Sequence, residues 1–234
     1  KQEVSMSIPT KELSISPFKK FANTSFWVLV VFLAIAIGLY PLTFFEVNHN
    51  EGLLSNKTPE LLANTFWNVA FYTHISLGGF SLLIGWSLFL KKFRAKKLHL
   101  HRLIGKIYVI AVLLSSVTGL VAAYYATGGV FAKLGFAGMS IAWFVCTYIP
   151  YKAIRNKNIQ KHERWMIRSY AVTFTGVTFR LWMPFLLIAF QLDFLEAYPI
   201  AAWASWIANL VVAQWLIRKR FGKSLKKVKQ CAFS

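Results

Sequence analysis

Three histidines stand where an imidazole ring could do chemistry: His74, His101 and His162 lie within, or at the start of, long apolar segments. A polar ring in apolar surroundings is costly without a partner, and neutral imidazole binds transition metals and haem iron. His101 and His162 each begin a segment amid Lys and Arg, where a helix N-terminus and nearby cations favour the neutral form. We expect the two rings at similar depth, either as a ligand pair or as interfacial residues bonded to lipid headgroups.

His74 lies on a face that residues at helical spacing would form, and this face is aromatic, small and polar: Trp67, Phe71, His74, Gly78, Ser81 and Gly85. Small residues allow a second helix to approach closely. The corresponding face of the next segment contains His101, Gly105, Tyr108, Val112, Ser115 and Gly119. Two interpretations of His74 stay open: a hydrogen bond to a Ser, Thr or carbonyl group of a neighbouring helix, and a metal or haem ligand.

A third polar face follows the basic stretch from Lys161 to Arg180, where helical spacing groups His162, Met166, Ser169, Thr173, Gly176 and Arg180. If one helix continues through this stretch, its first and last members share a face about 27 Å apart. We expect Arg180 to point inward to a polar partner, such as a Tyr, an Asn or His74. The alternative is a side chain that extends along the lipid to the membrane surface.

The composition indicates a membrane as the surroundings of these helices. Of 234 residues, 56% are hydrophobic, 17% aromatic and 15% charged, which is too apolar for one soluble core. Six segments are long and apolar enough to span a bilayer: 26–45, 63–90, 103–125, 131–151, 166–190 and 200–217. We therefore predict an all-α membrane protein with six transmembrane helices, in which helices two to five form a central bundle and two helices are peripheral.

The charges predict the orientation. The formal charge of +19 comes from 27 Lys and Arg against 8 Asp and Glu, and the basic residues cluster before the first span, after the second and fourth, and after the last. Five acids occupy the alternate loops: Glu46, Glu51, Glu60, Asp193 and Glu196. This bias predicts a multi-pass inner-membrane protein with both termini cytoplasmic. Anionic lipid headgroups account for the basic charge without nucleic acid as a partner.

We expect three parts in the chain: a cytoplasmic N-terminal segment (1–25) without the apolar run of a signal peptide, a transmembrane domain (26–220) and a basic cytoplasmic tail (221–234). Cys146 and Cys231 are too far apart in the expected topology for a disulfide, and they form no metal motif. His49 fits a solvated loop residue. The sequence Thr58-Pro59-Glu60 predicts a helix start before the second span.

Several of these residues recur in spaced motifs: His74-x-x-x-Gly78, His101-Arg102-x-x-Gly105-x-x-Tyr108, and His162-x-x-Trp165-Met166-x-Arg168-Ser169-Tyr170 followed by Arg180. Over about residues 65–190 the chain resembles a bacterial family of multi-pass membrane proteins catalogued as domain of unknown function 2306. No activity is assigned to that family. More distantly, the chain is similar to ascorbate-reducible transmembrane b-type cytochromes, whose four central helices hold two haems between paired histidines.

The cytochrome resemblance implies electron transfer through one b-type haem, with His101 and His162 as axial ligands on the cytoplasmic side. His74 corresponds to a ligand of the second haem, but the fourth helix lacks its partner histidine. In this hypothesis, cations pair with the haem propionates, aromatic rings pack the macrocycle, and one arginine at the far end binds an anion or a quinone carbonyl. The cations are Arg102, Lys106, Arg164 and Arg168, and the aromatic rings are those of Tyr108, Trp165 and Tyr170. The arginine at the far end is Arg180.

Two other functions stay open. A small transporter or metal-binding protein would line a cavity with the three histidines, although no acidic residue lies within a span to couple a cation. A non-catalytic subunit or accessory protein of a larger membrane complex would need only the apolar helices and the basic tail. The sequence does not decide whether the protein is an enzyme.

Overall fold

The computed structural model describes residues 17–45, 54 and 57–231, and the side chains of 24–43, 54 and 57–222 among them. Several sequence predictions fall outside these residues. They concern His49, the loop acids Glu46 and Glu51, residues 1–16 of the N-terminal segment, and the side chains of the tail from 223 onward.

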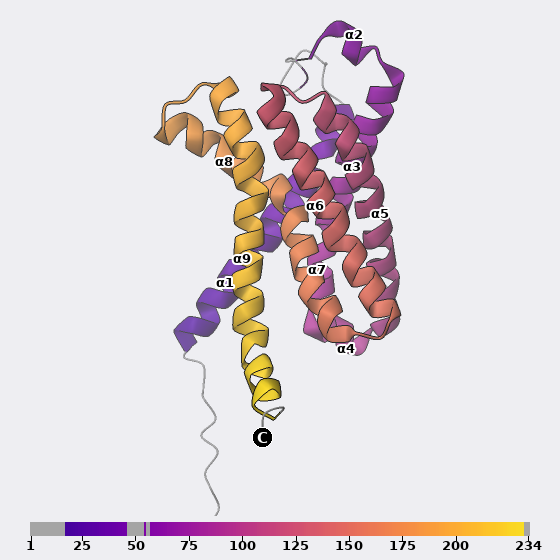
Figure 1. Cartoon of the computed structure of the whole chain (residues 1–234), viewed down its shortest axis with the longest axis vertical. Helices are drawn as coiled ribbons and strands as arrows, with labels where there is room; N and C mark the ends of the chain where they lie inside the picture. The colour runs from indigo at the N-terminus through magenta and orange to yellow at the C-terminus, as the bar shows by residue number, and fades with distance from the viewer. Residues whose placement is uncertain (1–16, 46–53, 55–56, 232–234) are drawn as a thin grey trace, which may run out of the picture.

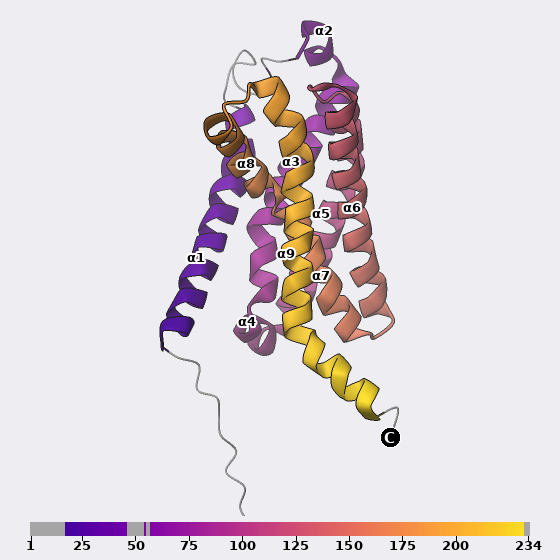
Figure 2. The ribbon, with the colours of Figure 1, turned by 60° about the vertical axis from the view of Figure 1, so that its left-hand side comes forward.

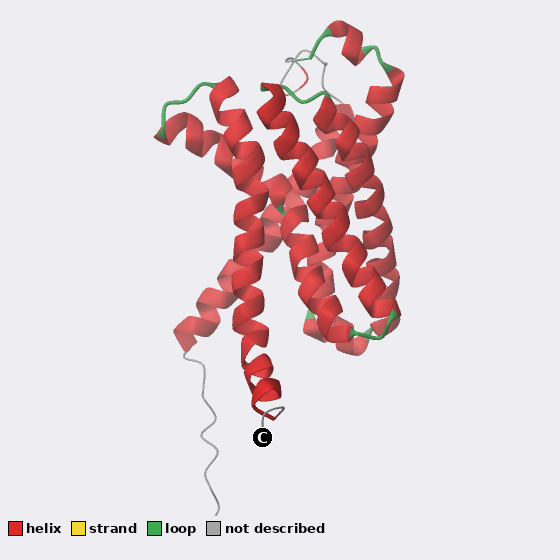
Figure 3. Ribbon diagram, in the orientation of Figure 1, coloured by secondary structure: helices red, strands yellow, loops and turns green. Residues whose placement is uncertain are grey.

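Every regular element among the described residues is a helix (Figure 3). In chain order they are α1 (Pro17–Leu39), η1 (Tyr40–Phe45), α2 (Pro59–Leu62), α3 (Thr65–Gly85), η3 (Trp86–Phe89), α4 (Lys91–Lys96), α5 (Leu98–Tyr124), α6 (Gly129–Arg155), α7 (Ile159–Thr173), α8 (Thr175–Ala189) and α9 (Phe194–Cys231). Five stretches are long and apolar enough to span a membrane, and α7 with α8 forms a sixth, bent candidate. The prediction of an all-α membrane protein is confirmed.

The central bundle consists of α3, α5, α6 and α7, which pack side by side (Figure 1). Helix α1 crosses α3, and α9 lies against α6 and α7, so the first and last spans are peripheral, as predicted. Figure 2 shows α1 leaning away from the bundle towards its N-terminal end. The predicted second to fifth spans therefore supply the bundle, except that the fifth contributes only its first half.

The bundle buries hydroxyl groups among its apolar core residues and exposes large apolar side chains on its outside. Buried hydroxyl groups occupy its interior: Ser81, Ser115, Ser116, Ser140, Thr147, Ser169 and Thr173. On the outer face of α5, large apolar side chains are about half exposed: Leu103, Ile107, Ile110 and Leu114. Because lipid solvates apolar groups and cannot satisfy hydroxyls, this arrangement suits a bilayer.

The basic segments meet at one end of the molecule. The start of α1, the helix α4, the α6–α7 loop and the C-terminal part of α9 all lie there, whereas α2 and the α5–α6 loop lie at the other end (Figures 1 and 2). We call the first the basic end, since it carries Lys91, Lys92, Arg94, Lys96, Lys97, Arg155, Lys157, Lys161 and Arg218 to Arg220. The opposite end carries the described loop acids Glu60, Asp193 and Glu196.

Short polar side chains start three of the helices. The Thr58 hydroxyl accepts a hydrogen bond from the Leu61 amide, with Pro59 in the first turn of α2, which confirms the predicted helix start. Asn64 caps α3 by accepting from the Trp67 amide at 3.0 Å. Asn158 caps α7 in the same way at the basic end, and this fixes where His162 enters the bundle.

The fifth span is not one continuous helix, contrary to the expectation of a single polar face from His162 to Arg180. It breaks at Phe174, and α8 continues at an angle of 43° to α7. Hydroxyl groups on both sides of the break bond to backbone carbonyls of the preceding turn, Thr173 to Ser169 and Thr178 to Phe174. Such bonds bend helices because they compete with the backbone ladder. Helix α8 then leaves the bundle and packs against α9.

Helices α1 and α3 approach closely at two glycines. A Cβ atom added to Gly79 would lie 2.7 Å from the Gly38 carbonyl oxygen, and one added to Gly38 would lie 2.6 Å from Leu83 Cγ. A residue with a side chain could therefore replace either glycine only if the neighbouring groups moved. The crossing of α1 over the bundle therefore depends on glycine at both positions.

Lys57 fastens two loops at the opposite end. Its amine donates hydrogen bonds to the Tyr125 carbonyl and, at 3.1 Å, to the Thr127 hydroxyl in the α5–α6 loop. Burial, with a smaller contribution from the charge of Lys133, lowers the pKa of Lys57 below its ordinary value.

Candidate functional site

A buried hydroxyl network joins α5, α6 and α7 at the centre of the bundle. The Tyr108 hydroxyl lies 3.0 Å from Ser169 Oγ and 2.8 Å from Thr173 Oγ1, and Thr147 Oγ1 lies 2.7 Å from Ser169 Oγ. The Trp143 indole donates to Thr173 Oγ1 at 2.9 Å. The Tyr108 side chain is fully buried, and its ring lies against Gly85 of α3.

Each hydroxyl has one hydrogen, so the direction of every bond in this network follows. Thr173 donates to the Ser169 carbonyl, which can only accept, and its oxygen must then accept from Tyr108. Ser169 consequently donates to Tyr108, and Thr147 donates to Ser169. The chain of donors Thr147, Ser169, Tyr108 and Thr173 therefore ends on a backbone carbonyl with every hydroxyl hydrogen used.

His74 joins α3 to α5. Its Nδ1 lies 2.8 Å from the Ser115 carbonyl oxygen, and because a carbonyl only accepts, Nδ1 carries the hydrogen. The Ser115 hydroxyl donates in return to the His74 carbonyl at 2.8 Å. The Trp143 ring meets the imidazole edge to face, with centroids 6.2 Å apart. This reciprocal pair matches the first of the two interpretations of His74, a hydrogen bond to a neighbouring helix.

The surroundings of His74 do not fit a haem. A Cβ atom added to Gly119 of α5 would lie 2.7 Å from His74 Nδ1 and 2.9 Å from Ser140 Oγ, so the three groups are already in contact. The residue that α6 presents here is Ser140, whose buried hydroxyl has no hydrogen-bond partner, and it is no haem ligand. These contacts favour the hydrogen-bonding role of His74 over that of a haem ligand.

His101 and His162 both lie at the basic end. They lie on α5 and α7, close enough for their imidazoles to interact electrostatically, and Arg94 and Arg102 lie within the same range of His101. His162 Nδ1 lies 3.0 Å from the Pro150 carbonyl oxygen and so carries a hydrogen; in the neutral ring the lone pair is then on Nε2. Such a bond from the second nitrogen is typical of metal-bound histidines.

Two observations at this pair fit an added group. His101 Nδ1 is buried without a hydrogen-bond partner. One turn further along α5, a Cβ atom added to Gly105 would meet nothing within 4 Å. Two imidazoles are also the full set of protein ligands that a bis-histidine haem takes. Among the described residues, no group of three or more His, Cys, Asp or Glu side chains comes together.

The predicted arginines lie in three places. Arg102 is exposed on α5 beside His101. Arg164 and Arg168 lie on α7 towards α9, where Arg164 contacts the Phe221 ring and Arg168 donates to the Gln214 side-chain oxygen at 2.6 Å. Arg180 lies on α8, outside the bundle.

Arg180 has an aromatic partner, but this partner is outside the central bundle. Its guanidinium lies 4.3 Å from the centre of the Tyr40 ring and donates to the Gly176 carbonyl at 2.7 Å. A tyrosine was among the expected partners. The side chain is nevertheless exposed, because the break at Phe174 turns α8 towards α1.

Glu163 ties the basic end together. Its carboxylate pairs with Arg94 of α4 at 2.7 Å and with Arg220 of α9 at 3.3 Å. These are the only ion pairs among the described side chains, and they connect the helix that carries His162 to its neighbours on both sides.

The sequence reasoning missed the contribution of α6. The helix buries Ser140, Trp143, Thr147 and Pro150 against the other helices, and none of these residues was predicted as a contact of the bundle. These four positions follow helical spacing and include the Thr147 hydroxyl and the Trp143 indole, which donate into the interior, so the polar residues of this span carried the signal. It also missed Gln214 as the partner of Arg168.

Residues 71–217, more than half of the chain, match the family described as predicted membrane protein (DUF2306). The chain belongs to this family. The matched residues run from α3 to α9 and include His74, His101, His162 and Arg180, whereas α1 lies outside the match. No curated protein and no solved structure gives a significant match. The DUF2306 description states a membrane protein and assigns no activity, so any role of the histidines is a proposal.

Proposed function

We propose that this integral membrane protein is an electron carrier in which His101 and His162 would hold one b-type haem at the basic end. What supports it is that these two imidazoles lie at the same end of α5 and α7, within electrostatic range of each other, and that one of them has its Nδ1 bonded to a carbonyl. When bound, haem supplies one-electron redox chemistry at its iron.

The neighbouring residues suit this role. Arg102 and Lys106 are exposed cations on the same helix as His101 and are available to carboxylate groups. Tyr108 lies two turns deeper, about 10 Å along α5, where its buried ring and hydroxyl separate the site from the rest of the bundle. Glu163 holds α7 in place beside α4 and α9. Arg168 is hydrogen-bonded to Gln214 on another face of α7, so we do not count it among the cations that would pair with the haem carboxylates.

The test is the absorption spectrum of the full-length protein purified from haem-replete cells. We expect a Soret band that His101→Ala and His162→Ala each abolish. His99→Ala is the matched control, because His99 is exposed on the first turn of the same helix, and it should leave the band intact. Circular dichroism shows whether each variant keeps its helices. A colourless preparation, or a band that survives both substitutions, would contradict the proposal.

We also propose that the protein lies in the inner membrane with the basic end in the cytoplasm. The meeting of α4, the α6–α7 loop and the end of α9 at one end supports this, because basic residues are retained on the cytoplasmic side. Reporter domains fused after Lys157 and after Asp193 should report opposite sides of the membrane, cytoplasmic for the first. The reverse result would refute the orientation.

A further inference from the structure

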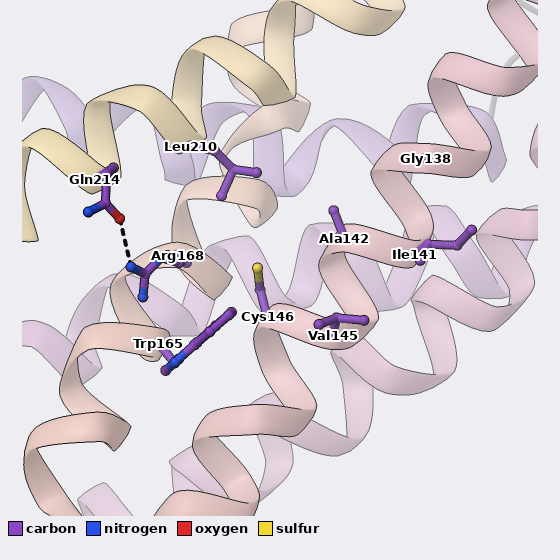
Figure 4. A pocket seen from close by; sticks show the side chains of 9 residues that line it. All are labelled: Gly138, Ile141, Ala142, Val145, Cys146, Trp165, Arg168, Leu210 and Gln214. Atoms are coloured by element: carbon purple, nitrogen blue, oxygen red, sulfur yellow. Dashed lines mark hydrogen bonds between the residues drawn. The ribbon is translucent and has the colours of Figure 1, made fainter.

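A groove on the outside of the bundle lies between α6, α7 and α9, with a volume of about 490 Å³. Figure 4 shows Trp165 and Arg168 at one end and Gly138 and Ile141 at the other. The walls of the groove are apolar. Two of the side chains that line it are partly exposed, Ile141 at 55% and Val145 at 42%. Since these helices are membrane spans, the groove opens towards the lipid.

The polar end of the groove holds a charged group. Arg168 donates to the Gln214 side-chain oxygen at 2.6 Å, and its guanidinium lies 4.6 Å from the centre of the Trp165 ring. Its other terminal nitrogen is 3.5 Å from the Arg164 carbonyl, so the side chain turns back towards the basic end. Gln214 is neutral and leaves the positive charge of Arg168 uncompensated.

A second cation reinforces this charge. Arg164 lies one turn nearer the basic end, and its Nε and Nη2 atoms are buried without a hydrogen-bond partner. The carboxylate next to it in sequence, Glu163, is already paired with two other arginines. No carboxylate among the described side chains pairs with Arg164 or Arg168. Two unpaired cations inside a membrane span are costly, and a bound anion would offset that cost.

The depth suits a lipid headgroup with its chain in the groove. Arg168 lies about 13 Å along α7 from Ile159, and a long side chain directed to the surface brings its charge closer to the headgroup layer. From Cys146 to Gly138 the groove continues about 12 Å deeper along α6. An apolar channel that starts at a cation fits a molecule with an anionic head and an aliphatic tail.

We propose that this groove binds an anionic phospholipid of the leaflet at the basic end. Arg168 and Gln214 contact the phosphate, Arg164 adds positive potential, and an acyl chain lies along Ile141, Val145 and Leu210. A zwitterionic lipid carries its own ammonium group and compensates the arginines less well. This site is separate from the histidine pair and does not depend on haem.

The test is native mass spectrometry of the full-length protein in detergent, titrated with phosphatidylglycerol or phosphatidylcholine. We expect phosphatidylglycerol to bind about tenfold more tightly, and Arg168→Gln to remove that preference. Arg155→Gln makes the same charge change on α6 at the basic end, outside the groove, and should keep it. Inorganic phosphate at millimolar concentration should not displace the lipid, because it lacks the chain.

A second variant separates the groove from the general charge and from folding. Ala142→Phe places a larger side chain in the apolar part of the groove and leaves Arg168 unchanged. It should therefore weaken phosphatidylglycerol binding severalfold while the helix content stays constant. Equal binding of the two lipids, full competition by phosphate, or unchanged affinity in Ala142→Phe would each overturn the proposal.

Discussion

Replacement of Tyr108 by Phe removes one hydroxyl from the buried network and keeps the ring that packs against Gly85. The Ser169 hydroxyl then loses the acceptor to which it donates, while Thr173 still accepts from Trp143. An unsatisfied buried hydroxyl costs about 1–3 kcal/mol in proteins, and hydrogen bonds within membrane bundles contribute about 0.6 kcal/mol on average. We therefore expect a loss of about 1–2 kcal/mol, or roughly a 5- to 30-fold change in the unfolding equilibrium constant.

The assay is equilibrium unfolding in mixed detergent micelles. Tyr124→Phe is the matched control, since that ring is 69% exposed at the end of the same helix, and it should change stability by less than about 0.5 kcal/mol. The double variant Tyr108→Phe with Ser169→Ala should cost less than the two single changes together, because the second change removes the orphaned hydroxyl. Full additivity, or a Tyr108→Phe variant as stable as the control, would refute the network.

Three further changes test other parts of the fold. At pH values between the lowered pKa of folded Lys57 and its ordinary value of 10.5, unfolding should be coupled to the uptake of a proton at Lys57. Stability should therefore rise with pH across this window. Thermal melts of Lys57→Met should not show this rise. Gly79→Ala should cost about 1–3 kcal/mol because its new Cβ would meet the α1 backbone, whereas Gly105→Ala, which meets nothing within 4 Å, should cost nothing. Glu163→Gln should cost only about 0.5 kcal/mol, because its pairs are partly exposed, and high salt should reduce the difference between the two proteins. A difference that salt leaves unchanged would show that the ion pairs are not its source.

Much of the fold followed from residue patterns. Apolar length predicted the spans, and the small and polar faces of the second, third and fifth spans predicted which sides meet in the bundle. The contacts of His74 with Ser115 and of Tyr108 with Ser169 confirm those faces. Such patterns are strong in a membrane, since lipid offers polar groups no alternative partner.

The break at Phe174 was not predicted, because neither proline nor paired glycine marks it. Thr173 and Thr178 bond to carbonyls of the preceding turn, but the periodic sequence pattern continues through both residues without interruption. The prediction that Arg180 points inward was consequently wrong, although a Tyr partner was expected and a lipid-facing side chain was the stated alternative. The partners of Arg168 and Glu163 come from α4 and α9, which lie far away in sequence, so residue spacing alone could not identify them.

The number of haem groups bound per chain tests the central proposal most directly. Haem extracted as its pyridine complex from the purified full-length protein, divided by protein from amino-acid analysis, should give one b-type haem per chain. One is expected because His101 and His162 lie within electrostatic range of each other at the basic end, whereas His74 is bonded to Ser115 and lies close to Ser140 and Gly119. A value of zero would remove the electron-transfer function, and a value of two would show that the site at His74 binds haem after all.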